Sequence, residues 1–291
     1  MIQLALLFNP TARGGRARRL LAPVLRRLRE GGAEVSVIVG TTAADALDRA
    51  RLAVAAGPDA LVAFGGDGLV HLAVQAVAGT GVPLGIIPAG TGNDIAGALG
   101  LPVADPSAAA DTVLRMRPRT VDAARIGAQE WFAGVVCCGF DSKVNERANA
   151  LSWPPGMAKY LLALAQELRV FRPMPFRLTL DDERVIELEA MLVAVGNTTS
   201  YGAGMRVCPA ALPDDGLLDV TVLGAVGRGA FLRAFPQVYR GTHAGHPAVT
   251  MLRAREIRLE APGAIAYADG ERVGPVPLTC RIEPGALHVL T

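Results

Sequence analysis

The sequence is poor in lysine and lacks the usual phosphate-binding signatures. Its lysines are Lys143 and Lys159, so residues 1–142 have none. The motif G-x-x-x-x-G-K-[ST] is absent, and the glycine-rich stretch at residues 65–68 is not G-x-G-x-x-G. A nucleotide bound by this part of the chain would therefore have to be held by backbone N–H groups, hydroxyls and carboxylates.

Long apolar runs, paired cysteines and strong net charge are also missing. No apolar run approaches the roughly 20 residues needed to cross a bilayer, and the apolar start "MIQLALLF" lacks a basic region. The cysteines show no metal-ligand spacing, and the net charge is only +2. These absences predict a cytoplasmic protein with no nucleic-acid partner.

What is present indicates two globular domains. The chain has 291 residues, of which 51% are hydrophobic and 19% charged, and single cores stop growing at roughly 250 to 300 residues. In residues 1–119, apolar runs alternate with helical periodicity, which predicts an α/β domain with a mostly parallel sheet. The expected strands are 3–8, 34–39, 60–64 and 83–87, and the expected helices are 16–29, 43–55, 70–78 and 94–99.

The pattern changes at Thr120. Short apolar and polar alternation with close turn signals predicts a β-rich second domain over residues 120–285, with helices near 157–171 and 229–240. Pro118 and the arginines beside it are expected to mark a hinge. The last strand, within residues 286–291, is expected to return to the first domain.

Three loops follow three of the expected parallel strands: "NPTARGG" at residues 9–15, "GGDG" at 65–68 and "PAGTGND" at 88–94. Parallel strands place such loops on one edge of the sheet, where ligands of α/β domains bind. Glycines allow close backbone approach, Thr91 offers a hydroxyl, and Asp67 and Asp94 can hold a magnesium ion directly or through water. Helix capping is an adequate structural alternative for Asn93 and Asp94.

Together with "PDDGLLDV" and "DGE", these loops occur in the order and spacing of the soluble bacterial diacylglycerol kinases, relatives of sphingosine and ceramide kinases, which this chain resembles from Phe8 to about Glu271. The resemblance implies a first domain that binds ATP and a β-sandwich second domain. It also implies that a membrane lipid, by family default diacylglycerol, offers its hydroxyl in the cleft between them.

Carried over onto this sequence, the resemblance implies a nucleotide site and a catalytic acid segment. Asp67 would be the essential acidic residue of the nucleotide site, Asp94 would complete it, and Glu271 would accept the proton of the lipid hydroxyl, with Asp269 as a substitute. As a structural alternative, Asp269 and Gly270 form a hairpin turn, which can itself present Glu271. The implied nucleotide-binding residues are Asn9, Pro10, Gly14, Gly65, Gly66, Asp67, Gly68, Gly90, Thr91 and Asn93.

The stretch "ALPDDGLLDV" resembles the segment in which the family holds a structural magnesium ion. Asp215 would donate its side chain, and Leu212 and Leu217 would donate their carbonyls. Without the family, "PDDG" is a turn before a strand, and Asp214 and Asp219 are alternative ligands.

The chain departs from the family pattern directly after "GGDG". Leu69 stands where a threonine is usual, and the usual asparagine-glutamate pair is replaced by His71 and Leu72. A lone histidine there is more often an ordinary polar residue at a helix start than a catalyst. The departure keeps open a non-catalytic nucleotide sensor, and "GGDG" keeps open an NAD kinase.

A lipid substrate requires peripheral contact with a membrane. The apolar segment around Trp153, Pro154 and Pro155 can serve as an interfacial wedge, although a core helix with a proline start is the preferred interpretation. Whether an edge strand pairs two copies into a homodimer is left open.

Overall fold

The N-terminal domain is a parallel sheet with helices on both faces. The computed structural model describes residues 1–10, 15, 17–128, 130–154 and 157–291. Four parallel strands lie in the order β4-β3-β1-β2. Their bounds are β1 Ile2–Phe8, β2 Ala33–Ile38, β3 Ala60–Gly65 and β4 Leu84–Pro88.

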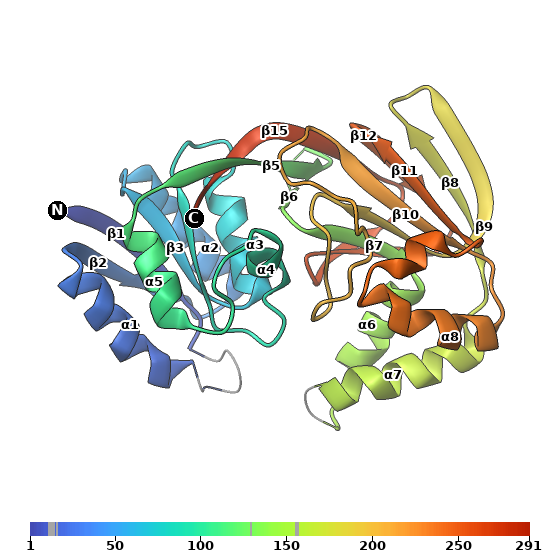
Figure 1. Cartoon of the computed structure of the whole chain (residues 1–291), viewed down its shortest axis with the longest axis horizontal. Coiled ribbons are helices and arrows are strands. Elements are labelled where there is room, and N and C mark those ends of the chain that lie inside the picture. The colour runs from blue at the N-terminus through green and yellow to red at the C-terminus, as the bar shows by residue number, and fades with distance from the viewer. Residues whose placement is uncertain (11–14, 16, 129, 155–156) are drawn as a thin grey trace.

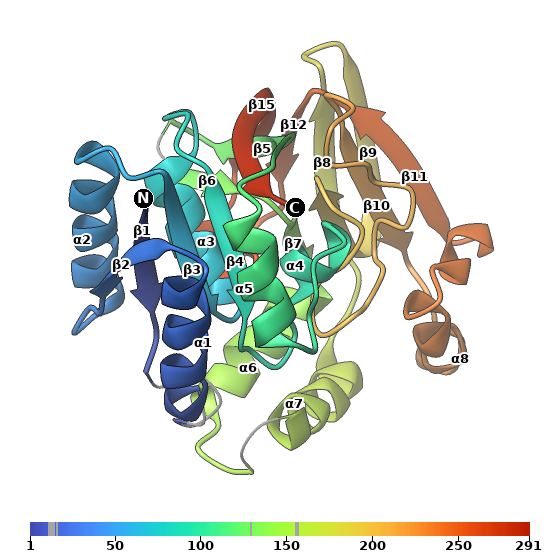
Figure 2. The same cartoon turned by 60° about the vertical axis from the view of Figure 1, so that its left-hand side comes forward.

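The helices of this domain bury the two faces of the sheet separately. Helices α2 (Ala43–Ala55) and α3 (Asp67–Val77) pack on one face, and α1 (Arg18–Glu30) and α5 (Pro106–Leu114) pack side by side on the other (Figure 2). Strand β3 is buried along its whole length, as expected for a central parallel strand. The short helix α4 (Asp94–Ala98) follows β4.

The second domain is a β-sandwich built mainly from antiparallel strands. The long strand β9 (Arg184–Gly196) pairs with β7, β8 and β10. Alternate residues of these strands form the core of the domain. The other strands are β6 Glu130–Phe132, β7 Val135–Gly139, β8 Met174–Leu180, β10 Leu218–Gly224, β11 Val249–Ala254, β12 Glu256–Glu260, β13 Ile265–Ala268 and β14 Glu271–Pro275.

Two long strands join the domains. Strands β5 (Pro118–Ile126) and β15 (Leu278–Leu290) pair antiparallel along the top of Figure 1, and the end of β15 lies beside β4 through Val289 and Leu84. Pro118 is therefore the first residue of a paired strand and does not lie in a free hinge. The proline is tolerated there because it begins the strand.

Three helices lie at one end of the sandwich: α6 (Phe140–Ala150), α7 (Met157–Val170) and α8 (Arg228–Val238) (Figure 1). Helix α7 packs into a hydrophobic cluster through Ala163 and Leu168, as expected of a core helix, while Leu161 and Val170 are exposed on it. A short 3-10 helix, η2 (Thr242–Gly245), follows α8. Among the described residues, no helix has both the length and the apolar character needed to cross a membrane.

Candidate active site

The loops after β3 and β4 touch each other backbone to backbone. The amide of Ala89 donates to the carbonyl of Gly65 (2.7 Å), and a Cβ on Gly90 would lie 2.4 Å from the Cα of Gly66. No side chain fits at that contact. The glycines of "GGDG" and "PAGTGND" are thus required first for the approach of the two loops.

Asp67 connects these loops through its side chain. It is the first residue of α3, which therefore begins three residues earlier than the periodicity predicts. Its carboxylate accepts the amide N–H groups of Asn93 (2.7 Å) and Ile95 (3.2 Å) at the start of α4. Neither Asn93 nor Asp94 caps α4 with its own side chain, because Asp67 does so from the neighbouring loop.

Asn93 instead stabilises its own loop. It adopts a left-handed conformation with φ of 59°, and its side chain accepts from the amide of Gly90 (2.9 Å) and donates to the carbonyl of Gly90 (3.1 Å). Asparagine tolerates this conformation better than most residues. The loop therefore has one defined shape, with Thr91 exposed at its tip.

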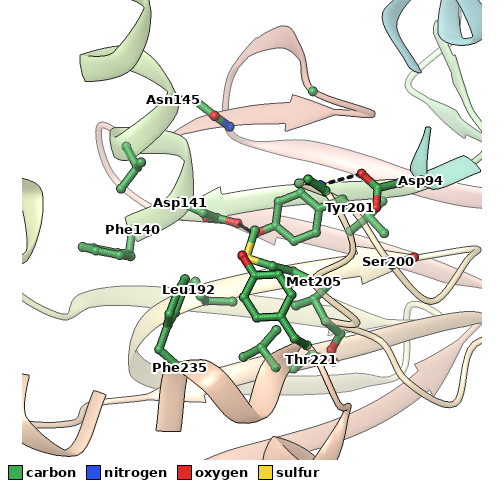
Figure 3. Close-up of a pocket in the computed structure, with 18 of the residues that line it drawn as sticks. Asp94, Phe140, Asp141, Asn145, Leu192, Ser200, Tyr201, Met205, Thr221 and Phe235 are labelled. Atoms are coloured by element: carbon green, nitrogen blue, oxygen red, sulfur yellow. Dashed lines mark hydrogen bonds between the residues drawn. The ribbon is translucent and has the colours of Figure 1, made fainter. Parts of the chain in front are cut away.

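Asp94 reaches from the first domain to the second. Its carboxylate accepts the amide N–H groups of Ala203 (2.7 Å) and Gly204 (2.6 Å), and Figure 3 draws one hydrogen bond of Asp94 as a dashed line. A Cβ on Gly92 would lie 2.9 Å from a carboxylate oxygen of both Asp67 and Asp94. The two carboxylates therefore flank the same glycine.

Glu271 enters the site from the second domain. It follows the turn formed by Asp269 (φ 52°) and Gly270 (φ 88°) between β13 and β14. A Cβ on Gly68 would lie 2.5 Å from Oε1 of Glu271, so the carboxylate rests against the first turn of α3. The hairpin turn and the presentation of Glu271 occur together.

One cavity of about 540 Å³ collects these groups. One end is lined by Asp67, Gly68, Thr91, Gly92, Asp94 and Glu271. The remainder is largely apolar and runs between α6, α7 and α8, with Phe140, Leu192 and Phe235 on its wall (Figure 3). A polar, acidic end thus opens into an apolar chamber.

A carboxylate that sequence reasoning missed also lines this cavity. Asp141, the second residue of α6, accepts the hydroxyl of Tyr201 (2.5 Å) and the amide of Ser142 (3.0 Å). Burial raises the pKa of Asp141, although these donors and Cys137 oppose the shift. Its partner Tyr201 is 60 positions away in an irregular loop, so no local pattern could reveal the pair.

The electrostatics of the acidic end suit a divalent cation. Burial raises the pKa of Asp67, and the charges of Asp94 and Asp269 raise it further against two amide donors. Over the described part of the chain, no group of three His, Cys, Asp or Glu side chains could hold a metal alone. A magnesium ion here would need phosphate oxygens and water as further ligands, as it usually does in kinases.

Asn9, Pro10 and Gly14 are the predicted nucleotide-binding residues of the first loop. Asn9 and Pro10 follow β1 at the same sheet edge, since Phe8 pairs with Phe64 of β3. Gly14 lies outside the described residues. Of the predicted residues of the second and third loops, Asp67, Gly68, Thr91 and Asp94 line one cavity with Glu271. Gly65, Gly66, Gly90 and Asn93 are not among its lining residues.

Each carboxylate of the "PDDG" loop forms an ion pair with an arginine. Arg253 pairs with Asp215 and, at 3.2 Å, with Asp219, while Arg119 pairs with Asp214 at 2.6 Å. The exposed Leu212 and the half-buried Leu217 flank these residues on either side. Because arginine already supplies positive charge, these contacts do not fit a magnesium site, and a metal ion at Asp215, Leu212 and Leu217 stays a prediction.

Comparisons with known proteins agree over both domains. Residues 3–126 match the diacylglycerol kinase catalytic domain, and residues 134–291 match the YegS C-terminal NAD kinase beta sandwich-like domain. A diacylglycerol kinase of Mycobacterium tuberculosis (strain ATCC 25618 / H37Rv) is 44% identical over 98% of this chain and 93% of its own length. A probable lipid kinase YegS-like protein of Pseudomonas aeruginosa PAO1 is 34% identical over 90% and 86%.

Both domains therefore define a lipid kinase fold. The chain belongs to the diacylglycerol kinase family of lipid kinases.

Solved structures show the same fold. A diacylglycerol kinase of Bacillus anthracis superimposes with a TM-score of 0.75 at 23% identity, covering 99% of this chain and 96% of that one. Yeast NADH kinase, crystallised with NADH, gives 0.55 at 12% identity, covering 99% and 82%. At these identities both likenesses concern the fold alone.

Proposed function

We propose that the protein transfers the γ-phosphate of ATP to the hydroxyl of diacylglycerol, giving phosphatidic acid and ADP. The observation that carries this proposal is the continuity of one cavity from Asp67, Asp94 and Glu271 to the apolar chamber between α6, α7 and α8. Acyl chains fit an apolar chamber, whereas a second polar nucleotide would leave its polar groups without partners there.

The residues of the site divide the work of phosphoryl transfer. The first N–H groups of an α-helix lack partners within the helix, so α3 directs its first turn, with Gly68, toward the phosphates. Glu271 takes the proton of the lipid hydroxyl while the oxygen of that hydroxyl bonds to the γ-phosphorus and the bond to ADP breaks. Asp94 holds the loop at Ala203 and Gly204 in place beside the acceptor.

Magnesium fits at Asp67 and Asp94 because two carboxylates flank Gly92, and burial, with the charge of Asp94, raises the pKa of Asp67. Bound there with ATP, it would neutralise charge on the phosphate oxygens. Asp67 and Asp94 keep carboxylate lone pairs beyond those that accept backbone amides.

The proposal extends to peripheral contact with an anionic bilayer through α7, α8 and Trp153. Trp153, Leu161 and Leu232 are 75%, 59% and 56% exposed around the end of the sandwich that contains the apolar chamber. The two helices carry the cations Lys159, Arg169, Arg228 and Arg233, and their one acidic residue, Glu167, is paired with Arg147. Exposed apolar groups with cations favour an anionic lipid surface.

The direct test is transfer of labelled γ-phosphate from ATP, with magnesium, to diacylglycerol in mixed micelles. Other lipids and NAD are run in parallel. We expect label in phosphatidic acid, and we expect Asp67→Ala and Glu271→Gln each to lower the rate by about 100-fold or more. Label in another lipid would correct the substrate, label in NAD would overturn the lipid assignment, and ATP binding without transfer would favour the sensor.

A further inference from the structure

His71 is buried one turn into α3, although it is polar. It is only 7% exposed, and its Nδ1 lies 3.0 Å from Oδ2 of Asp269, which belongs to the second domain. His71 is therefore a buried contact between the two domains. Its partner is 198 positions further along the chain.

Asp269 is itself held by an unusual number of backbone donors. Its side chain is completely buried, and its carboxylate accepts the amides of Ala133 (3.2 Å), Gly134 (2.9 Å) and Val135 (3.1 Å). Its own amide donates to the carbonyl of Val135 (3.0 Å). These bonds fix the turn at the start of β7, and His71 ties the same turn to α3.

Helix α3 thus touches the β13–β14 turn at two points. Gly68 meets the carboxylate of Glu271, and His71 meets Asp269. Gly68 and His71 are three residues apart, which places them on one face of the helix. We propose that His71 is a positioning residue that holds the β13–β14 turn, and with it the carboxylate of Glu271, against the phosphate-binding end of α3. The inference rests on the proposed function only for the role given to Glu271.

The surroundings of His71 are acidic on every side. Asp269 faces His71 from the β13–β14 turn, and the charge of Glu271 on β14 also acts on it. Glu130, on β6, lies 3.8 Å from Nε2 of His71. The neutral Gln75 contacts the same nitrogen from within α3. Burial lowers the pKa of His71, but the hydrogen bond and charge of Asp269, with Glu130 and Glu271, outweigh it and raise the pKa above 6.5. The contact is therefore strongest below that raised pKa and weakens as the pH rises through it.

Steady-state kinetics test the role. We expect His71→Ala to lower kcat by about 10- to 100-fold, because a small displacement of a reacting group is costly, while KM for ATP changes less than about threefold. His71→Gln, which keeps a donor without the charge, should recover part of the loss. The ratio of wild-type kcat to that of His71→Gln should fall as the pH rises through the raised pKa.

Gln75→Ala is the matched structural control. Gln75 lies one turn further along α3, exchanges hydrogen bonds with the backbone of Trp131 (2.6 and 2.9 Å) and contacts Nε2 of His71 at 3.3 Å. Its loss removes these part-buried bonds but not the bond between Nδ1 of His71 and Asp269. It should lower stability without a comparable loss of kcat. A kcat of His71→Ala within threefold of wild type, or no lower than that of Gln75→Ala, would overturn the proposal.

Hydrogen exchange separates this inference from the proposed function. Amides of residues 266–273 should exchange faster in His71→Ala, or in His71→Gln if the alanine variant does not fold, but not in Gln75→Ala. This readout needs no turnover. If wild type phosphorylates no lipid, the proposed function fails, but the exchange experiment still tests whether His71 holds the β13–β14 turn. Unchanged exchange in the His71 variants would refute that role.

Discussion

Gly68 lies against the carboxylate of Glu271, the proposed base. A Cβ at this residue would lie 2.5 Å from Oε1 of Glu271, which is the mobile end of a side chain and can move away. We expect Gly68→Ala to fold normally and to lower kcat by about 100-fold, because the carboxylate is displaced from the acceptor hydroxyl. Thermal unfolding and kinase assays measure the two effects.

The control for this change is Gly97→Ala. Gly97 is also helical, on α4, and its added Cβ would make only an ordinary contact at 3.7 Å with Val103. That variant should keep full activity and gain about 0.4 to 1 kcal/mol of stability. Full activity in Gly68→Ala would show that Glu271 does not act from the position described.

The ionised carboxylate of Asp67 lowers the stability of the fold because it is buried. Burial is the main reason that its pKa is raised above the ordinary value of 3.8, so the folded state holds this proton more tightly than the unfolded chain. Wild type therefore loses stability as the pH rises from 3.8 through the folded pKa, and Asp67→Asn lacks that loss.

Urea unfolding without nucleotide, at several pH values between about 4 and 7, measures this difference. The stability of Asp67→Asn relative to wild type should improve with increasing pH, while its kinase activity stays at background. A relative stability that falls with pH would mean that the ionised carboxylate is favoured in the fold.

At the scale of elements, the first sheet is predictable from sequence and the helices around the cavity are less so. Strands β1 to β4 and helix α2 have clear apolar patterns, and their glycine-rich loops follow them directly. Helix α5 is rich in alanine, and α6 begins directly after β7 without a turn signal, so both escape a search for periodicity. Distant pairs such as His71 with Asp269 depend on the packing of the domains, which no local pattern records.

The loop between β9 and β10 depends on one tyrosine. The hydroxyl of Tyr201 donates to the buried carboxylate of Asp141, while two neighbouring amides hold Asp94. We expect Tyr201→Phe to cost about 1 to 3 kcal/mol of unfolding free energy, because it removes a donor from a buried acceptor. Urea denaturation measures this cost. Tyr239→Phe on the half-exposed Tyr239 should change stability by less than about 0.5 kcal/mol, and an equal effect of both changes would refute the argument.

At the scale of the whole molecule, the site exists only because two domains meet. Strands β5 and β15 run from one domain to the other along the top of Figure 1. The side chain of Asp94 also joins the domains, through Ala203 and Gly204 of the second. The sequence indicates two domains and a last strand that returns to the first, but the long pairing of β15 with β5 becomes visible only in the folded structure.

The proposed attachment to a membrane concerns the whole molecule. Replacing Trp153 by Ser and Leu232 by Ser removes exposed apolar surface near the apolar chamber without touching Asp67, Asp94 or Glu271. We expect about tenfold weaker sedimentation with anionic vesicles and a higher KM for lipid, with KM for ATP unchanged, since the lost term is burial in the interface. Leu52→Ser is the control, because Leu52 is 73% exposed on α2, in the other domain. If it weakened vesicle binding as much, the docking surface would not lie on the helices of the sandwich.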